Sequence, residues 1–148
     1  MRENVQTDMQ AKPQEQAIST EKDDEMFAFL SMLDAGGIDT AVGMKYCMND
    51  VAFYTEILKE FVSGADDREQ ALSKCLAGGD IDKYRIYVHS LKSSARTIDA
   101  DELSKKAEDM ENAAKALDIK YLHENHETLI SMLKMSVGGI LMAINMYE

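Results

Sequence analysis

Apolar residues recur along most of the chain at steps of three and four positions, the spacing of one face of an α-helix. Four long stretches have this spacing: from Asn49 or Asp50 to Ala77, from Ile81 to Ile98, from Asp99 to Leu117, and from Asp118 towards Ile144. Glycine or aspartate separates neighbouring stretches, as is typical of helix ends and caps. No segment alternates with a period of two for long enough to predict a strand. The pattern therefore predicts an all-α protein whose four long helices pack as an up-down bundle.

The region before these helices divides into two parts. Residues 23–37 contain an apolar run that predicts a short helix ended by two glycines, and a further helical turn is expected over residues 39–46. Residues 1–22 hold the only proline and almost no large apolar side chains, so they cannot bury enough surface to offset their ordering entropy. We expect a flexible tail or linker over residues 1–22 and a bundle domain over residues 23–148, with an N-terminal helical extension.

Composition narrows the class of protein. The 148 residues are 45% hydrophobic and carry a formal net charge of −11. A strongly acidic chain is unsuited to neutralising phosphates, which excludes general nucleic-acid binding. Cys47 and Cys75 are too few for a disulfide framework and indicate a reduced, cytoplasmic setting. No uninterrupted apolar run approaches the ~18 residues of a membrane helix, and the N-terminus lacks the apolar segment of a signal peptide, so no membrane insertion is expected.

A basic stripe lies beside the apolar stripe of the predicted helix 81–98. At about 100° per residue, Arg85, His89, Lys92 and Arg96 fall within about 60° of one another. The segment carries four cations against one acid, a net charge of +3, so the remainder of the chain carries −14. Such a basic lane suits an anion or a small acidic partner. The nearby cations favour the neutral, nucleophilic form of His89 and can balance the charge of a phosphoryl group on it.

The segment His89-Ser90-Leu91-Lys92-Ser93-Ser94-Ala95 resembles the H-x-L-K-G-S-A signature of histidine-containing phosphotransfer (HPt) domains. These are helical bundles that carry phosphoryl groups between receiver-domain aspartates in bacterial phosphorelays. The resemblance extends helix by helix over residues 38–137. It implies that His89 is the phosphoacceptor and that Lys92 assists the phosphoryl group. Arg85 and Arg96 are each either receiver-docking contacts or ordinary solvated charges.

Two positions depart from the pattern of the family. Ser93 stands where the family usually has a glycine that lets the receiver's active-site loop come close, so we expect slower or more selective docking. Asp99 replaces a second frequent glycine just before Ala100. With Glu102 three residues later, Asp99 is expected to cap the next helix in a capping-box arrangement and so to serve the turn.

The resemblance implies a mechanism and a set of partners. A neutral nitrogen of His89, expected to be Nε2, attacks the aspartyl phosphate of a response-regulator receiver domain and later passes the phosphoryl group to another receiver. Magnesium and most of the transition-state stabilisation come from the receiver, so no metal or cofactor is expected in this chain. No glycine-rich phosphate loop is present, which indicates a transfer intermediate without an ATP site. A hybrid sensor histidine kinase is a candidate partner, and an exposed histidine serves in a monomer.

Other interpretations stay open. One alternative is a helical module that binds receivers without carrying phosphate, favoured if His89 is buried or dispensable. A metal-binding or hydrolytic bundle is another, because His123 and His126 lie near one helix face beside two glutamates, although a solvated helix start explains them more simply. The acidic run of residues 108–111 is interpreted as a solvated face. The eleven methionines are interpreted mainly as core filler, with a soft partner-binding surface as the alternative.

Overall fold

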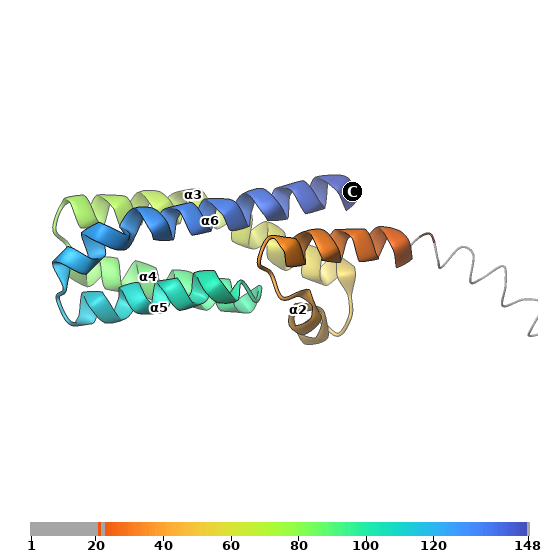
Figure 1. The fold of residues 1–148 in the computed structure, drawn as a ribbon, viewed down its shortest axis with the longest axis horizontal. Coiled ribbons are helices and arrows are strands. Elements are labelled where there is room, and N and C mark those ends of the chain that lie inside the picture. Colours follow the sequence, from red (N-terminus) through yellow and green to blue (C-terminus); the bar gives the residue numbers. More distant parts are fainter. Residues whose placement is uncertain (1–20, 22, 148) are drawn as a thin grey trace, which may run out of the picture.

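The chain is helical almost throughout in the computed structural model, which describes residues 21 and 23–147 (Figure 1). After an N-terminal helix over residues 23–35, the helices are α2 (Thr40–Tyr46), α3 (Val51–Ala77), α4 (Ile81–Thr97), α5 (Asp101–Lys115) and α6 (Ile119–Tyr147). Within the described residues there is no strand, and an isolated bridge joins Ile38 to Ala100. The predicted all-α class is confirmed. The predicted tail over residues 1–22 lies outside the described residues, except for residue 21, whose backbone is helical.

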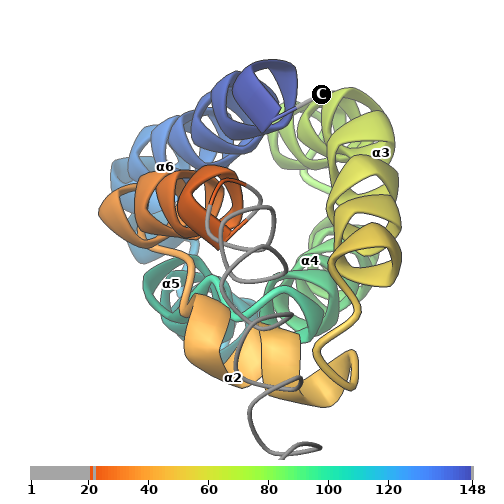
Figure 2. The ribbon, with the colours of Figure 1, turned by 90° about the vertical axis from the view of Figure 1, so that its right-hand side faces the viewer.

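Helices α3 to α6 form the predicted four-helix bundle. Each packs against two neighbours, α3 against α4 and α6, and α5 against α4 and α6. Viewed from the end, α4 and α6 therefore stand diagonally across the bundle (Figure 2). The core contains large side chains from all four helices, among them Tyr54, Leu58, Tyr84, Leu91, Met110, Leu122 and Leu129. The apolar stripe predicted for α4 is buried as expected, which turns the basic stripe beside it towards solvent.

Aspartate caps begin most of the helices where the sequence predicts a beginning. Asp39, Asp50, Asp80 and Asp118 each accept a hydrogen bond from the backbone N–H three residues later, over distances of 3.1 to 3.5 Å. These carboxylates satisfy donors that have no partner inside the helix and lie at the positive end of its dipole. The starts of α2, α3, α4 and α6 are therefore fixed locally.

The N-terminal extension covers one end of the bundle. Helices α3 and α6 reach beyond α4 and α5, and the N-terminal helix lies alongside this overhang (Figure 1). Phe29 stacks on Tyr147 with ring centroids 4.7 Å apart. A β-carbon on Gly139 would lie 3.8 Å from the Cα of Gly36, so the two glycines allow the helices to approach closely. Gly138 and Gly139 do not end α6, because packing outweighs their weak helix propensity.

Helix α6 corrects one expectation from the sequence. It is the one helix in the described part of the chain that is long and apolar enough, by length and composition, to cross a membrane. Its apolar span is not an uninterrupted apolar run, because it includes serine, glycine and one lysine. The core helix of a soluble protein meets the same criterion, and Leu129, Leu133 and Ile140 of α6 are buried inside the bundle.

The turn before α5 also differs from the prediction. The N-cap of α5 is Ala100, without a side-chain cap, and Asp99 adopts a left-handed conformation with φ of 59°. Its carbonyl accepts a hydrogen bond from the backbone N–H of Asp39, 2.9 Å away, which joins this turn to the start of α2. The turn requires a positive φ, and a residue held there cannot also serve as an N-cap with extended backbone. The predicted capping box is therefore wrong, and Asp99 takes over the backbone conformation of a glycine.

Replacing Asp99 by glycine is expected to raise the free energy of unfolding by about 1 kcal/mol at pH 7. Glycine adopts a positive φ without the steric penalty of a β-carbon. Burial and, after it, the charges of Asp101 and Asp39 raise the pKa of Asp99, so its ionised carboxylate is unfavourable in the folded state. Urea unfolding followed by circular dichroism measures the change. Asp101→Gly, in the first turn of α5, serves as the control and should destabilise the protein; a loss of stability in Asp99→Gly would contradict the account.

Candidate functional site

His89 lies at the middle of α4 and faces solvent. Its side chain is 58% exposed. The residues on its buried side, Val88 and Leu91, are fully buried and fix the rotation of the helix. Helix packing therefore holds the imidazole at the surface of the bundle, beside α5.

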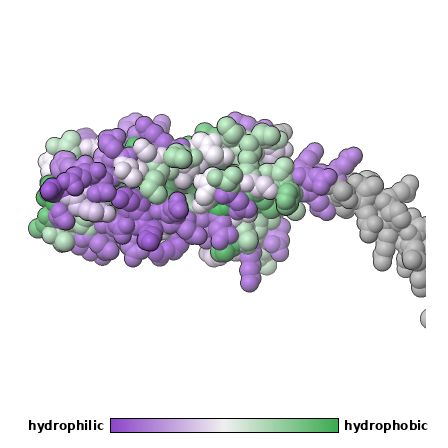
Figure 3. All heavy atoms as spheres, viewed as in Figure 1, coloured by the Kyte–Doolittle hydropathy of each residue, from purple (hydrophilic) through white to green (hydrophobic). Residues whose placement is uncertain are grey.

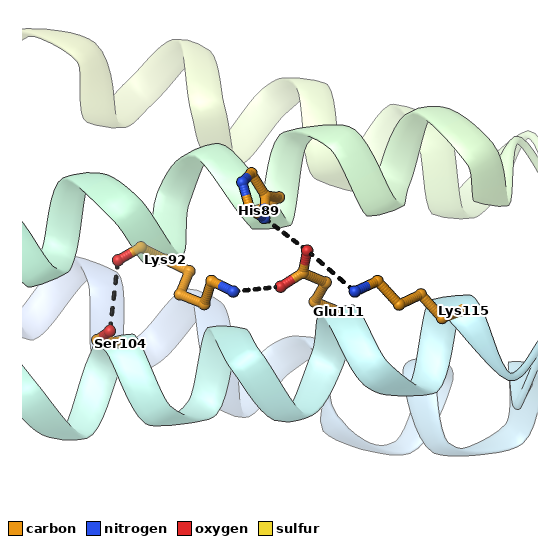
Figure 4. Close-up of polar contacts among 5 residues, drawn as sticks. All are labelled: His89, Lys92, Ser104, Glu111 and Lys115. Atoms are coloured by element: carbon orange, nitrogen blue, oxygen red, sulfur yellow. Dashed lines mark hydrogen bonds and ion pairs between the residues drawn. The ribbon is translucent and has the colours of Figure 1, made fainter.

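A carboxylate from α5 holds the ring in place (Figure 4). Oε2 of Glu111 lies 2.6 Å from Nδ1 of His89, and its Oε1 lies 2.6 Å from Nζ of Lys92. The ammonium group of Lys115, one helical turn along α5, lies 3.8 Å from Oε2. The Glu111 side chain is only 5% exposed, so one buried carboxylate connects the histidine to two cations.

Glu111 is ionised in this arrangement. Burial by itself would raise the pKa of Glu111, but the hydrogen bonds from Lys92 and His89 outweigh it, and the pKa lies below its ordinary value. An ionised carboxylate only accepts hydrogen bonds, so Nδ1 of His89 must be the donor. In the neutral ring the proton then sits on Nδ1, and the lone pair of Nε2 points away from Glu111. This carboxylate selects the tautomer and orients the ring.

Lys92 is less exposed than a basic stripe suggests. Its side chain is 15% exposed, because the ammonium group turns towards Glu111. The hydroxyl of Ser104 on α5 donates a hydrogen bond to the backbone carbonyl of Lys92 over 3.3 Å, a second link between the two helices. The cation therefore lies beside the histidine as part of a fixed network.

The other three predicted surface residues also lie on α4, before and after His89 along the helix. Arg85 is half-buried, whereas Ser93 and Arg96 are exposed. Ser93 and Arg96 line a shallow hollow together with Val42 and Tyr46 of α2. The structure thus brings two of the three predicted docking residues together at one place, beside an exposed aromatic side chain, and leaves Arg85 on the other side of His89 along the helix.

Arg68 of α3 supports α4 from its other flank. The guanidinium group donates hydrogen bonds to the hydroxyls of Ser90 and Ser94, at 2.8 and 2.7 Å. Burial lowers the pKa of Arg68 from its ordinary value. Both serines belong to the seven-residue motif, so the segment that carries His89 is attached to α3 on one side and to α5 on the other. Nothing in the sequence pattern marks Arg68, because its partners lie on another helix.

Glu111 was missed as well, and the prediction of a solvated face for residues 108–111 is wrong at this position. The sequence does contain a signal. Glu111 follows Ala107 by four residues and precedes Ala114 by three, and both alanines are buried. The carboxylate therefore belongs to the apolar face of α5, where an acid needs a partner.

One histidine of the second cluster, His126, has a structural role. His126 is buried, and it hydrogen-bonds with the hydroxyls of Tyr84 and Ser73, at 3.0 and 3.1 Å. Burial lowers the pKa of His126, which keeps it neutral. The prediction of a solvated helix start holds for His123, Glu124 and Glu127, which are exposed, and is wrong for His126. No group of three potential metal ligands occurs among the residues that the structure describes.

Fold and site together define a class: a helical bundle that presents one exposed, carboxylate-oriented histidine beside cations. A family model of the Hpt domain matches residues 56–136, more than half of the chain. The chain belongs to the Hpt domain family. A role in phosphotransfer within a two-component phosphorelay, together with receiver domains, follows from that membership.

Two solved structures have a similar fold. The HPt domain of the Hpt sensor hybrid histidine kinase from Shewanella superposes with a TM-score of 0.67 at 12% identity, covering 74% of this chain and 95% of that one. Histidine-containing phosphotransfer protein B from Pseudomonas aeruginosa PAO1 superposes with a TM-score of 0.62 at 19% identity, covering 75% and 94%. No match was found among curated proteins. At these identities the likeness concerns the fold, and the roles of individual residues must be argued from the site.

Proposed function

We propose that Nε2 of His89 accepts a phosphoryl group from a receiver-domain aspartate and passes it to a second receiver. The observation that carries this proposal is the hydrogen bond from Nδ1 to the buried Glu111, which leaves Nε2 as the free nucleophile on an exposed ring. The alternative of a receiver-binding module without phosphate is favoured by a buried or a dispensable His89; the exposure of His89 gives no support to the first, and the transfer experiments below test the second.

The transfer needs no proton to leave the ring. The lone pair of Nε2 attacks the phosphorus of the aspartyl phosphate, the bond between phosphorus and the aspartate oxygen breaks, and the receiver carboxylate leaves with that electron pair. The imidazole then carries the phosphoryl group on Nε2 and a proton on Nδ1, and its positive charge faces the ionised Glu111. In the onward step a second aspartate attacks the same phosphorus, and the lone pair returns to Nε2.

Two lysines place positive charge near the ring that receives the phosphoryl group. Lys92 and Lys115 lie within 4 Å of the Glu111 carboxylate, so positive charge stands beside the ring that receives the phosphoryl group. This placement balances the dianionic phosphoryl group after transfer. Magnesium is supplied by the receiver, and this chain contributes the oriented nucleophile.

The receiver docks over the exposed side of α4, between α2 and the histidine. Ser93 and Arg96 face this side, next to the exposed ring of Tyr46. A cation and an aromatic side chain around a small residue suit an approach by an acidic active-site loop. The predicted bacterial and cytoplasmic setting, and a hybrid sensor kinase as donor, stay predictions.

The size of residue 93 is expected to control docking. Ser93→Trp should lower the second-order rate constant of transfer at least about tenfold, because the indole occupies the space into which the receiver loop descends. Ser93→Gly should leave that rate unchanged or raise it. Stopped-flow measurement of receiver dephosphorylation gives both values. Ala77→Trp, at the exposed C-terminal end of α3 and outside the hollow lined by Ser93 and Arg96, is the control. Equal rates in wild type and Ser93→Trp would place the docking surface elsewhere.

The direct test is phosphoryl transfer to the wild-type chain. A panel of phosphorylated receivers is incubated with the protein and magnesium, and the label is then exposed to acid and to base. Label that appears on this chain, is lost in acid and resists base identifies a phosphohistidine. Failure of every receiver in the panel to transfer would refute the proposal if receivers nevertheless bind.

A further inference from the structure

A second helical stripe on α6 faces solvent. Ser131, Met135, Gly138, Met142 and Asn145 are all exposed, with 75% exposure at Met135 and 60% at Met142. The surface over the C-terminal half of α6 and the N-terminal helix is more apolar than the surface over α5 (Figure 3). The core-facing stripe of α6 is already packed in the bundle, so this second stripe is an additional face.

The spacing of the stripe is that of a helix-packing seam. Its five positions follow one another at steps of four, three, four and three residues, the a and d positions of a coiled coil. The flanking positions add Leu141 and Met146, which are also exposed. A single solvated methionine needs no explanation, but Met135, Leu141, Met142 and Met146 together form an exposed apolar face, and such a face marks a contact surface.

This face differs from the rest of the molecule in its charge. The whole chain carries −11, yet the stripe contains no ionisable side chain. Lys134 is the one charged residue between Leu129 and Met146, and its ammonium group is 3.1 Å from the carboxylate of Glu69. Two copies of so acidic a protein repel each other over most of their surface, and this face is where they can approach.

Two copies of this stripe have complementary shapes when they face each other. Gly138 has open space where its β-carbon would stand, so it forms a gap between the knobs of Met135 and Met142. When two α6 helices run antiparallel, a positions pack against d positions of the other copy. Met142 of each copy then covers Gly138 of the other, and Met135 meets Asn145. A parallel pair would set glycine against glycine and leave that layer empty.

We propose that this chain forms an antiparallel homodimer through the outer face of α6. The sequence-based expectation was a monomer, because one exposed histidine needs only one chain; the face on α6 is the observation that points to two. Since α6 stands diagonally across the bundle from α4, the dimer leaves both copies of His89 open to receivers (Figure 2). A two-helix seam lies below about 1,200 Å² of buried surface, so the dimer is weak and depends on concentration.

Sedimentation velocity from about 1 µM to about 500 µM tests the proposal. Wild type should move from the mass of one chain, 16.6 kDa, towards twice that mass. Gly138→Lys and Met142→Lys should each raise the dimer dissociation constant at least about tenfold by placing two charges in the seam. A β-carbon at position 138 meets nothing within 4 Å in the single chain, and lysine replaces a weak helix former, so Gly138→Lys should keep the fold. Ile86→Lys, a 58% exposed apolar residue on α4, is the matched control and should dimerise like wild type.

Cysteine pairing tests the orientation. In an equimolar mixture under mild oxidation, Met135→Cys and Asn145→Cys should form mixed disulfide dimers in preference to like-with-like dimers. Phosphoryl transfer should be equal in wild type and Gly138→Lys, since the seam lies away from His89. A monomer at every concentration, or a dimer that tolerates both lysines, would overturn the proposal. Binding of monomeric wild type to phosphatidylcholine vesicles, lost in Met142→Lys, would overturn it too and assign the face to a membrane.

Discussion

His89→Gln is expected to take up no phosphoryl group from any phosphorylated receiver. The glutamine amide nitrogen is delocalised into its carbonyl and is not a nucleophile, so the bond to phosphorus cannot form. The side chain at position 89 is 58% exposed and its removal uncovers no core, so the fold and receiver binding should be kept. Incorporation of radiolabelled phosphate, quenched over a time course, measures the loss.

The chain offers a matched control for this variant. His123 is an exposed histidine on α6, and His123→Gln should be labelled at the wild-type rate. A pull-down with a phosphorylated receiver checks that His89→Gln still binds. Label on His89→Gln equal to wild type would show that another residue carries the phosphoryl group and that the motif has been assigned the wrong role.

Glu111→Ala is expected to slow phosphoryl transfer by roughly 10- to 100-fold. Without the carboxylate, Nδ1 loses its acceptor, the ring turns freely, and part of the population carries its proton on Nε2. The same change leaves the ammonium group of Lys92 largely buried and unpaired, at a cost of about 3 kcal/mol in the free energy of unfolding. Transfer kinetics and urea unfolding separate the two effects. Unchanged kinetics in a folded Glu111→Ala would remove Glu111 from the mechanism.

The stabilisation by Glu111 should depend on pH. Its pKa in the folded protein lies below the ordinary value of about 4.3, so its contribution is fully present above that value and is lost as pH falls through the lower folded pKa. Glu111→Gln keeps the shape and removes the charge. The difference in free energy of unfolding between wild type and Glu111→Gln should therefore be larger at pH 7 than at about pH 3. A difference that is the same at both values would mean that Glu111 is not ionised in the folded state.

The sequence predicts the helices well because their boundaries are local. Each of Asp50, Asp80 and Asp118 caps a helix within three residues of itself, and the apolar spacing that follows decides which face is buried. The stripe with His89, Lys92 and Arg96 follows from the same helix geometry. These features need no information about other helices.

The site residues that the sequence does not predict are those that form contacts between helices. Glu111 meets His89 across 22 positions of sequence, and Arg68 meets Ser90 across the same number. Which carboxylate faces which imidazole depends on how far α5 slides along α4, and periodicity does not determine that offset. Glu111 was nevertheless detectable as an acid within an apolar stripe. Asp99 was not, because an aspartate before a helix is far more often a cap than a substitute for a left-handed glycine.

The most direct measurement is the position of the phosphoryl group on the histidine ring. The protein, labelled with ¹⁵N at histidine, is phosphorylated by a receiver and examined by ¹⁵N and ³¹P NMR. The account predicts one phosphohistidine, at residue 89, with phosphorus bonded to Nε2 and the proton on Nδ1. Phosphorus bonded to Nδ1, or found on any other residue, would contradict it, because Glu111 occupies Nδ1 in the arrangement described above.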